Sequence, residues 1–234
     1  MRWLSWDELP EELRCEEVRP YYNTLNAKRG SLAAKRAFDV AASVCIFAVT
    51  WWLFLILAIA IKVDSPGPVF YRQTRVTQYG REFRIFKFRT MVQGADRLGT
   101  AVTTSGDARV TRVGAFIRKY RLDEFSQLID VFRGTMSLVG TRPEVPKYVE
   151  RYSNEMRATL LLPAGVTSYA SIAYKDEADL LDAADDVDAT YVEKVLPGKM
   201  KFNLRDIEEF SLKRDLSLMV RTVTAVFGPD RAEG

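Results

Sequence analysis

An uncharged run at residues 40–61 constrains this chain more than any other feature. It holds 22 consecutive residues without an acidic or basic side chain. As a helix rising about 1.5 Å per residue, it matches a hydrocarbon core about 30 Å thick. The alternative is a buried helix of a water-soluble protein, but such helices seldom stay apolar on every face over this length. We therefore predict a membrane helix.

The flanking charges do not decide whether this helix crosses the membrane or enters and leaves by the same face. The flanking cations are Lys28, Arg29, Lys35 and Arg36 before the run, and Lys62, Arg72 and Arg75 after it. A re-entrant helix with both ends in the cytoplasm satisfies the positive-inside rule at both ends. Trp51 and Trp52 favour an interfacial position, and Thr50 can bend a helix by bonding a preceding carbonyl. We expect a re-entrant helix, with a spanning helix as the alternative.

The 234-residue chain contains no histidine, which excludes many kinds of active site. Ser-His and Cys-His nucleophile pairs, histidine bases and histidine-ligated zinc are all ruled out. The two cysteines, Cys15 and Cys45, have no disulfide or metal spacing, which is typical of a reducing compartment. A net charge of +3 does not indicate nucleic-acid binding, although a pI of 8.8 suits an anionic membrane or a phosphorylated ligand. Carboxylates are the natural nucleophiles that remain, and magnesium is the metal they favour.

An adjacent carboxylate pair, Asp123-Glu124, lies near the middle of the chain. Three cations precede it (Arg118, Lys119 and Arg121), and apolar residues with helical spacing follow it, so we place the pair at the start of a helix. Acids at a helix start are common in any protein, because they cap the helix and interact well with its dipole. The same field attracts phosphate, and a nucleophilic carboxylate beside a phosphate site is an arrangement for phosphoryl transfer.

We divide the chain into three parts. Residues 1–34 form an N-terminal extension, residues 35–64 a membrane anchor and residues 65–228 a catalytic domain. The scattered apolar residues of the extension exclude a signal peptide. We expect a short amphipathic helix up to about Val18 and a linker over residues 20–29.

The third part is predicted to be an α+β domain that is rich in helix and contains a small β-hairpin. Residues 69–89 are rich in aromatic and branched side chains around the turn signal Gln78-Tyr79-Gly80, which predicts two short strands. Residues 94–106 have the composition of a mobile loop. We expect a helix over residues 145–162 and a turn followed by a short strand over residues 164–174.

Two segments near the end have distinctive polarity. Residues 176–188 carry seven acids, which is usual for a solvated helical face. The last segment places apolar residues along one side of a helix, namely Leu216, Met219, Val220, Val223 and Phe227. Such a pattern next to a membrane anchor predicts an amphipathic helix in the membrane interface.

Five motifs, in this order, give the chain a resemblance to a known family. They are Lys35-Arg36-Ala-Phe-Asp39, Tyr71-Arg-Gln-Thr-Arg75, Lys87-Phe-Arg-Thr-Met91, Asp123-Glu124 and Gly134-Thr-Met-Ser-Leu-Val-Gly-Thr-Arg-Pro143. Together they resemble the small monotopic phosphoglycosyltransferases, the bacterial sugar transferase family of undecaprenyl-phosphate sugar-1-phosphate transferases. The resemblance covers about residues 35–228.

The resemblance implies a site and a reaction. Asp123 would attack the sugar-bearing phosphorus of a UDP-sugar, release UMP and form an aspartyl phosphosugar, from which polyprenyl phosphate takes the phosphosugar. Glu124, together with Asp123, would hold Mg²⁺. Cationic side chains would bind or orient the substrates, and these are Arg75, Lys87, Arg89, Arg118, Arg142 and Lys175. The protein would act at the cytoplasmic face of the bacterial inner membrane and begin a surface glycan, and a homodimer is left open.

Two strings depart most from the family pattern. Trp51-Trp52 stands where members commonly have Ser-Pro in the middle of the membrane helix. Pro163-Ala-Gly-Val-Thr-Ser168 replaces a form close to Arg-Pro-Gly-Ile-Thr-Gly, so we expect a donor sugar that differs from those of common members.

Two alternatives accompany this interpretation. In the first, the lipid phosphate attacks the donor directly and Asp123 only orients groups. In the second, the protein is a non-catalytic membrane adaptor that binds anionic lipids, and it would then tolerate Asp123→Asn and Glu124→Gln.

Overall fold

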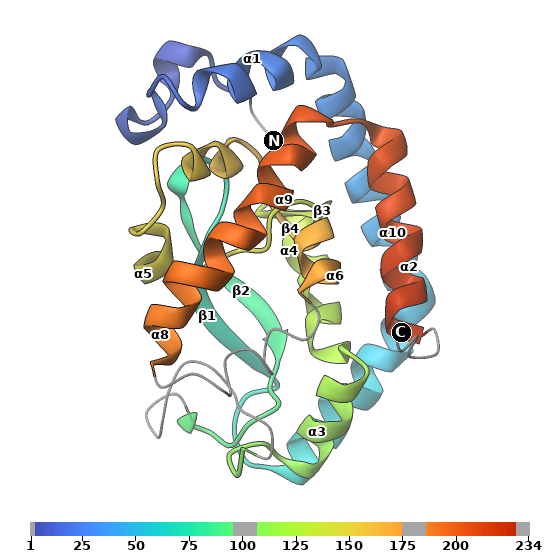
Figure 1. The fold of residues 1–234 in the computed structure, drawn as a ribbon. Helices are drawn as coiled ribbons and strands as arrows, with labels where there is room; N and C mark the ends of the chain where they lie inside the picture. Colours follow the sequence, from blue (N-terminus) through green and yellow to red (C-terminus); the bar gives the residue numbers. More distant parts are fainter. Residues whose placement is uncertain (1–2, 96–106, 175–185, 228–234) are drawn as a thin grey trace, which may run out of the picture.

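The computed structural model describes residues 3–95, 107–174 and 186–227. Figure 1 shows a helix-rich fold that also contains two small β-sheets, in agreement with the predicted α+β class. The α-helices are α1 (Arg19–Ala27), α2 (Arg29–Asp64), α3 (Arg112–Lys119), α4 (Leu128–Arg133), α5 (Pro146–Val149), α6 (Tyr169–Ala173), α8 (Val187–Thr190), α9 (Leu196–Glu208) and α10 (Leu212–Phe227). The strands are β1 (Phe70–Val76), β2 (Glu82–Phe88), β3 (Met136–Val139) and β4 (Ala164–Thr167).

Helix α2 contains the whole of the uncharged run and extends it to 36 residues. It is long and apolar enough to cross a membrane, and only 11% of its most apolar 18-residue window is buried against the protein. Large side chains such as Val49 (71% exposed), Trp51 (56%) and Trp52 (51%) are therefore uncovered. Thr50 donates its hydroxyl to the carbonyl of Ile46 at 2.6 Å, as predicted. The re-entrant topology remains a prediction.

The first third of α2 is tied to three other elements by the charged residues of the first family motif. Lys35 pairs with Asp215 of α10 at 2.5 Å, and Figure 1 shows the two helices side by side. Arg36 donates to backbone carbonyls at the end of α4. Asp39 is buried and accepts a hydrogen bond of 2.7 Å from the Ser137 hydroxyl on β3. This motif therefore holds α2 on the rest of the fold.

Strands β1 and β2 form the predicted antiparallel hairpin, with Tyr71 opposite Lys87 and Arg75 opposite Phe83. The predicted turn, Gln78–Gly80, is a short 3₁₀ helix. Its residue Tyr79 has a positive φ of 61°, which a non-glycine residue seldom adopts. The hairpin exists because aromatic and branched residues alternate on both sides of a strong turn signal.

Strands β3 and β4 form a parallel pair that was not predicted. At this pair the two segments of backbone approach each other unusually closely. A Cβ atom added to Gly165, in β4, would lie 2.2 Å from the nitrogen of Gly140, the residue after β3. The Gly165 amide also donates to the Thr141 carbonyl at 2.8 Å. Only glycine at these positions allows the contact, which fixes the start of the Thr141-Arg142-Pro143 segment.

The predictions for the second half of the chain were partly wrong. Residues 145–162 do not form one helix, because α5 and the 3₁₀ helix Met156–Leu161 are separated by non-helical residues. In residues 164–174 the strand comes first and α6 follows. The predicted loop at 94–106 and the acidic segment at 176–188 lie largely outside the described residues. Helix α10 confirms the last predicted helix, while its place in the membrane interface remains a prediction.

The N-terminal extension also differs from its prediction. Residues up to Val18 form two 3₁₀ turns, Trp6–Glu8 and Glu11–Leu13, rather than an amphipathic helix. Helix α1 occupies most of the predicted linker. Proline at position 20 lies in the first turn of α1, where its missing N–H costs nothing.

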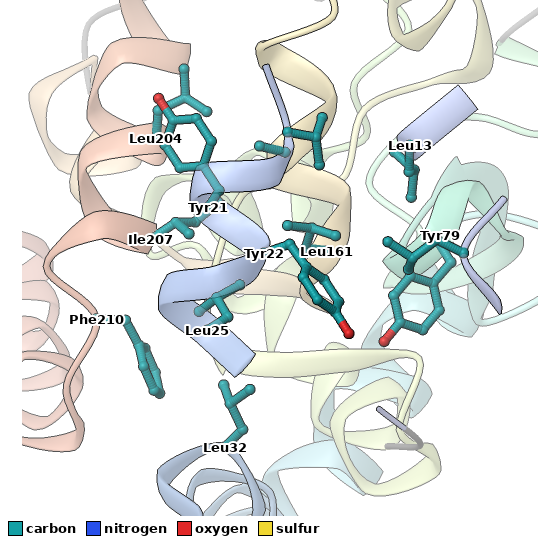
Figure 2. Packing of buried hydrophobic residues seen from close by; sticks show 13 residues of the cluster. Leu13, Tyr21, Tyr22, Leu25, Leu32, Tyr79, Leu161, Leu204, Ile207 and Phe210 are labelled. Atoms are coloured by element: carbon teal, nitrogen blue, oxygen red, sulfur yellow. The ribbon is translucent and has the colours of Figure 1, made fainter. Parts of the chain in front are cut away.

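Figure 2 shows that the extension shares a hydrophobic core with the rest of the protein. Leu25 is fully buried and Tyr22 is 5% exposed. These residues pack with side chains of the turn between β1 and β2, of the 3₁₀ helix Met156–Leu161, of α9 and of the loop between α9 and α10, namely Tyr79, Ala158, Leu161, Leu204, Ile207 and Phe210. Lys28 adds a hydrogen bond of 2.8 Å to the Phe210 carbonyl. The extension is therefore packed onto the fold and is not a free tail.

Candidate active site

A cleft of about 1090 Å³ opens over the β1–β2 hairpin. Among the described residues, eight cationic ones line it, namely Arg72, Arg75, Arg84, Lys87, Arg89, Arg109, Arg118 and Arg142. Among the described residues that line it, none carries a carboxylate. A cleft of this size, lined by positively charged side chains, suits a ligand with several negative charges.

Asp123 lies in the first turn of the 3₁₀ helix Leu122–Gln127, which continues into α4. The predicted helix start is thus confirmed, although its first turns are 3₁₀ rather than α. The residue before the helix, Arg121, has a left-handed backbone with φ of 51°, so the chain turns sharply out of α3. This turn brings the carboxylate against β2. Asp123 is 5% exposed, and its Oδ2 lies 2.8 Å from Lys87 Nζ.

Lys87 and Arg118 bring positive charge to Asp123 from two elements. Lys87 lines the cleft and keeps about a third of its side chain exposed, so it connects the buried carboxylate to the cleft. Arg118, on α3, donates its Nε to the Thr90 hydroxyl at 2.8 Å. Burial lowers the pKa of the Arg118 guanidinium, and the Asp123 charge opposes this effect. Two predicted cations therefore lie where they can stabilise negative charge at Asp123.

Glu124 points to a different partner. Its Oε1 forms an ion pair of 2.5 Å with Arg142, which follows β3. Burial alone would raise the pKa of Glu124, but the charges of Arg142 and then Lys87 outweigh it and lower that pKa to about 2. Glu124 in turn raises the pKa of Arg142. Both groups are therefore charged at neutral pH.

Arg75 is held by the segment that carries Arg142, residues 141–144, which we call the strap. Its Nη1 donates to the Pro143 carbonyl at 3.1 Å, and its Nη2 donates to Gln73 Oε1 at 2.7 Å. Burial lowers the pKa of the Arg75 guanidinium, and the charge of Glu144 opposes this effect. Because Arg75 and Gln73 both line the cleft, they add a cation and an amide to its wall.

Arg89 has a structural role in this structure. Its guanidinium donates to the carbonyls of Pro66 (2.6 Å), Ser65 (2.7 Å) and Ile61 (3.4 Å) at the end of α2. It thereby ties the end of α2 to the end of β2, and its contact with substrate remains a prediction. Lys175, the remaining predicted substrate-binding residue, lies outside the described residues.

Several cleft residues were missed by the sequence analysis. Gln127 is 3% exposed and lines the cleft one turn after Asp123. Arg109 also lines it, and the guanidinium is held by the carboxylate of Asp107. Gln73 could have been found, because it alternates with Tyr71 and Arg75 on one predicted strand. No local pattern marks Gln127 or Arg109.

The carboxylate pair suits magnesium, although it does not form a large acidic cluster. Among the described residues, no group of three or more His, Cys, Asp or Glu side chains is close enough to hold a metal ion. Magnesium commonly binds only one or two protein carboxylates and completes its shell with water and substrate phosphates. Asp123 and Glu124 supply that number of carboxylates, and a magnesium site at the pair remains a prediction.

Comparisons with known proteins agree with the resemblance seen in the motifs. A family profile described as bacterial sugar transferase matches residues 30–229. A protein of Aeromonas hydrophila, "UDP-N-acetylgalactosamine-undecaprenyl-phosphate N-acetylgalactosaminephosphotransferase", is 35% identical over 195 residues, which cover 82% of this chain and 43% of that protein. A "UDP-glucose:undecaprenyl-phosphate glucose-1-phosphate transferase" of Caulobacter vibrioides is 36% identical over 85% of this chain and 71% of its own length.

A protein of the same name from Escherichia coli is 34% identical over 91% of this chain. The match covers 44% of that protein, so this chain spans less than half the length of the Aeromonas and Escherichia relatives. Residues 1–29 lie outside the family profile.

Proposed function

Because this chain belongs to the bacterial sugar transferase family, we propose that it transfers a sugar 1-phosphate from a UDP-sugar to a polyprenyl phosphate. The observation that carries the proposal is the buried Asp123 carboxylate, ion-paired to Lys87 beneath a cleft lined by eight cations. The names of the relatives support undecaprenyl phosphate as the acceptor. They name more than one donor sugar, so the sugar is left open.

The charge distribution of the site favours a diphosphate donor. A UDP-sugar carries two linked phosphates, and transfer of one of them requires cations placed where negative charge develops. Lys87, Arg118 and Arg142 come from three different elements and converge around the Asp123-Glu124 pair. They can stabilise the transition state without a histidine, which the chain lacks.

Asp123 acts as the nucleophile in the proposed reaction. A carboxylate oxygen of Asp123 forms a bond to the phosphorus that bears the sugar, and the bond from that phosphorus to the bridging oxygen breaks. The electron pair leaves with UMP. A phosphate oxygen of the polyprenyl phosphate then attacks the same phosphorus, and the Asp123 carboxylate leaves. The product is a polyprenyl diphosphate sugar, which would begin a surface glycan.

Splitting the transfer in this way lets one cleft accept a soluble donor and a lipid acceptor in turn. Lys87 holds Asp123 in place before the donor binds, and its ammonium group can then interact with the negative charge of the phosphate in the transition state. Arg142 keeps Glu124 ionised, and Arg118 orients a phosphate from the side of α3. Glu124, with Asp123, would hold Mg²⁺, which when bound neutralises charge on the donor diphosphate.

The membrane helix explains how the acceptor reaches the cleft. Arg89 and Asp64 connect the end of α2 to β2 and α3, the two elements that bear Lys87 and Arg118. A lipid phosphate held at the surface beside α2 would therefore lie close to the site. We place both ends of α2 at the cytoplasmic face of the bacterial inner membrane, where nucleotide sugars are available.

The test is release of UMP by purified protein. With magnesium, a matching UDP-sugar and no acceptor, the wild-type protein should release about one equivalent of UMP per enzyme, because the covalent intermediate cannot turn over. Asp123→Asn should remove this burst. Asp206→Asn is the matched control, since this acid pairs with Arg214 and neither residue lines the cleft. Mass spectrometry should find a phosphosugar on the peptide that contains Asp123.

Each alternative predicts a different result. Acceptor-dependent turnover without a burst or adduct would show direct attack by the lipid phosphate. No UMP release from any UDP-sugar, with liposome binding that Asp123→Asn leaves unchanged, would identify a non-catalytic adaptor.

A further inference from the structure

Three buried titratable side chains outside the carboxylate pair contact one another. Tyr191 donates its hydroxyl to Glu144 Oε1 at 2.5 Å, and Lys199 donates to the Tyr191 hydroxyl at 3.1 Å. Lys199 Nζ also lies 3.6 Å from the same Glu144 oxygen. All three residues are less than 9% exposed. Buried charge is costly unless it is paired, so the placement of this carboxylate needs an explanation.

Glu144 belongs to the strap of chain that positions both arginines of the cleft wall. Two residues before it, Arg142 pairs with Glu124. One residue before it, the Pro143 carbonyl accepts the Arg75 guanidinium. The Glu144 carbonyl itself accepts the amide of Val76, the residue after Arg75. The backbone of this strap is thus bound to β1, and its one acidic side chain is anchored to the helical segment that starts at Tyr191.

The carboxylate also acts on the arginines by its charge. Glu144 opposes the effect of burial on the pKa of Arg75, and after Glu124 and burial it contributes to the raised pKa of Arg142. Glu144 is therefore one of the carboxylates whose charge stabilises the Arg142 guanidinium. Without Glu144, Arg75 and Arg142 would both lose a negative charge that keeps them ionised beside the cleft.

We propose that Glu144, held by Tyr191 and Lys199, is a positioning residue that keeps Arg75 and Arg142 directed at the phosphates of the donor. This inference rests on the proposed function. The competing explanation is purely structural, in which Glu144 only neutralises Lys199. The two explanations differ in what happens when both members of that pair are removed together.

The experiment compares Glu144→Gln with the double variant Glu144→Gln/Lys199→Met, and uses Asp206→Asn as a control for loss of another partly buried acid. Glutamine keeps the shape of Glu144 and can still accept the Tyr191 hydroxyl. The single variant removes the Glu144 charge from beside the buried Lys199 and should lower Tm, whereas the double variant should recover much of that Tm. UMP release gives kcat and KM for the UDP-sugar.

A positioning role predicts that both variants lose about tenfold in kcat/KM, mainly through a higher KM, because the arginines are misplaced in each. Recovery of kcat/KM together with Tm in the double variant would show that Glu144 is only structural. A change within twofold in Glu144→Gln would also overturn the inference.

A second measurement separates this inference from the proposed function. Inorganic pyrophosphate binding to the full-length protein, measured by calorimetry, should weaken about tenfold in both variants and remain unchanged in Asp206→Asn. If the wild-type protein releases no UMP from any UDP-sugar, the proposed function fails and the pyrophosphate result still decides the role of Glu144. Equal affinity in wild type and both variants would refute it.

Discussion

Replacing Arg142 by leucine should leave Glu124 buried without its guanidinium. The ordinary pKa of this carboxyl is 4.5, and in the folded protein it is about 2. At about 1.4 kcal/mol for each tenfold change in proton affinity, the difference corresponds to about 3 kcal/mol of stabilisation at neutral pH. Loss of one partner from a buried ion pair costs a similar amount, about 3 to 5 kcal/mol. We expect Arg142→Leu to lose about 3 kcal/mol at pH 7.5.

The pH dependence should change sign between the two proteins. In the wild type the pKa of Glu124 is lowered, so its stabilisation is complete above pH 4.5 and is lost as the pH falls toward 2. In the variant, burial dominates and raises the pKa of Glu124 above its ordinary value. A raised pKa favours the folded protein at low pH, and this stability is lost as the pH rises through the folded pKa. The loss of stability relative to the wild type should therefore be smaller at pH 5 than at pH 7.5.

Urea titrations in detergent, followed by tryptophan fluorescence, measure the free energies of unfolding at both pH values. Glu124→Gln and Glu124→Gln/Arg142→Leu form the control pair, because the effect of the arginine change should not depend on pH once the carboxylate is gone. A loss below about 1 kcal/mol in Arg142→Leu, or an equal loss at both pH values, would refute the assignment of Glu124 as a buried anion held by Arg142.

Two further predictions test the surroundings of the site. Lys87→Met should lower the rate of UMP release about a hundredfold, as loss of a charge-stabilising donor does elsewhere, whereas Lys62→Met on the exposed end of α2 should keep the wild-type rate. Gly165→Ala should cost about 3 kcal/mol or more in unfolding free energy, because its Cβ would overlap the backbone of Gly140. Gly30→Ala is the control, since nothing lies within 4 Å of the added Cβ, and it should be neutral or stabilise by up to about 1 kcal/mol. Equal stability of the two variants in urea titrations would contradict the close approach.

The parts of the fold that could be predicted are those in which neighbouring residues decide the outcome. The uncharged run alone determines the long helix, and the turn signal with its flanking aromatic residues determines the hairpin. The Asp123-Glu124 pair could be placed at a helix start because cations precede it and an apolar periodicity follows. The cationic motifs predicted which side chains bind the substrates, but they did not predict that these side chains line one cleft.

The missed parts depend on contacts between distant segments. Nothing near Gly140 shows that Gly165 will approach it, so the parallel strands were not predicted. Residues 20–29 were predicted to be a linker, but Pro20 lies in the first turn of α1. The sequence could not distinguish Arg89 from the other arginines of the cleft wall, since only the folded chain shows that its guanidinium donates to the carbonyls of Ile61, Ser65 and Pro66 at the end of α2 and just after it.

The packing of the extension has a practical consequence for anyone who expresses part of this protein. The family profile begins at residue 30, yet Leu25 is completely enclosed by residues on both sides of that limit. A shortened gene that starts at residue 30 would uncover Ile207 and Phe210, and the product would be prone to aggregate. The stretch that the family profile matches is therefore shorter than the stretch that packs together here.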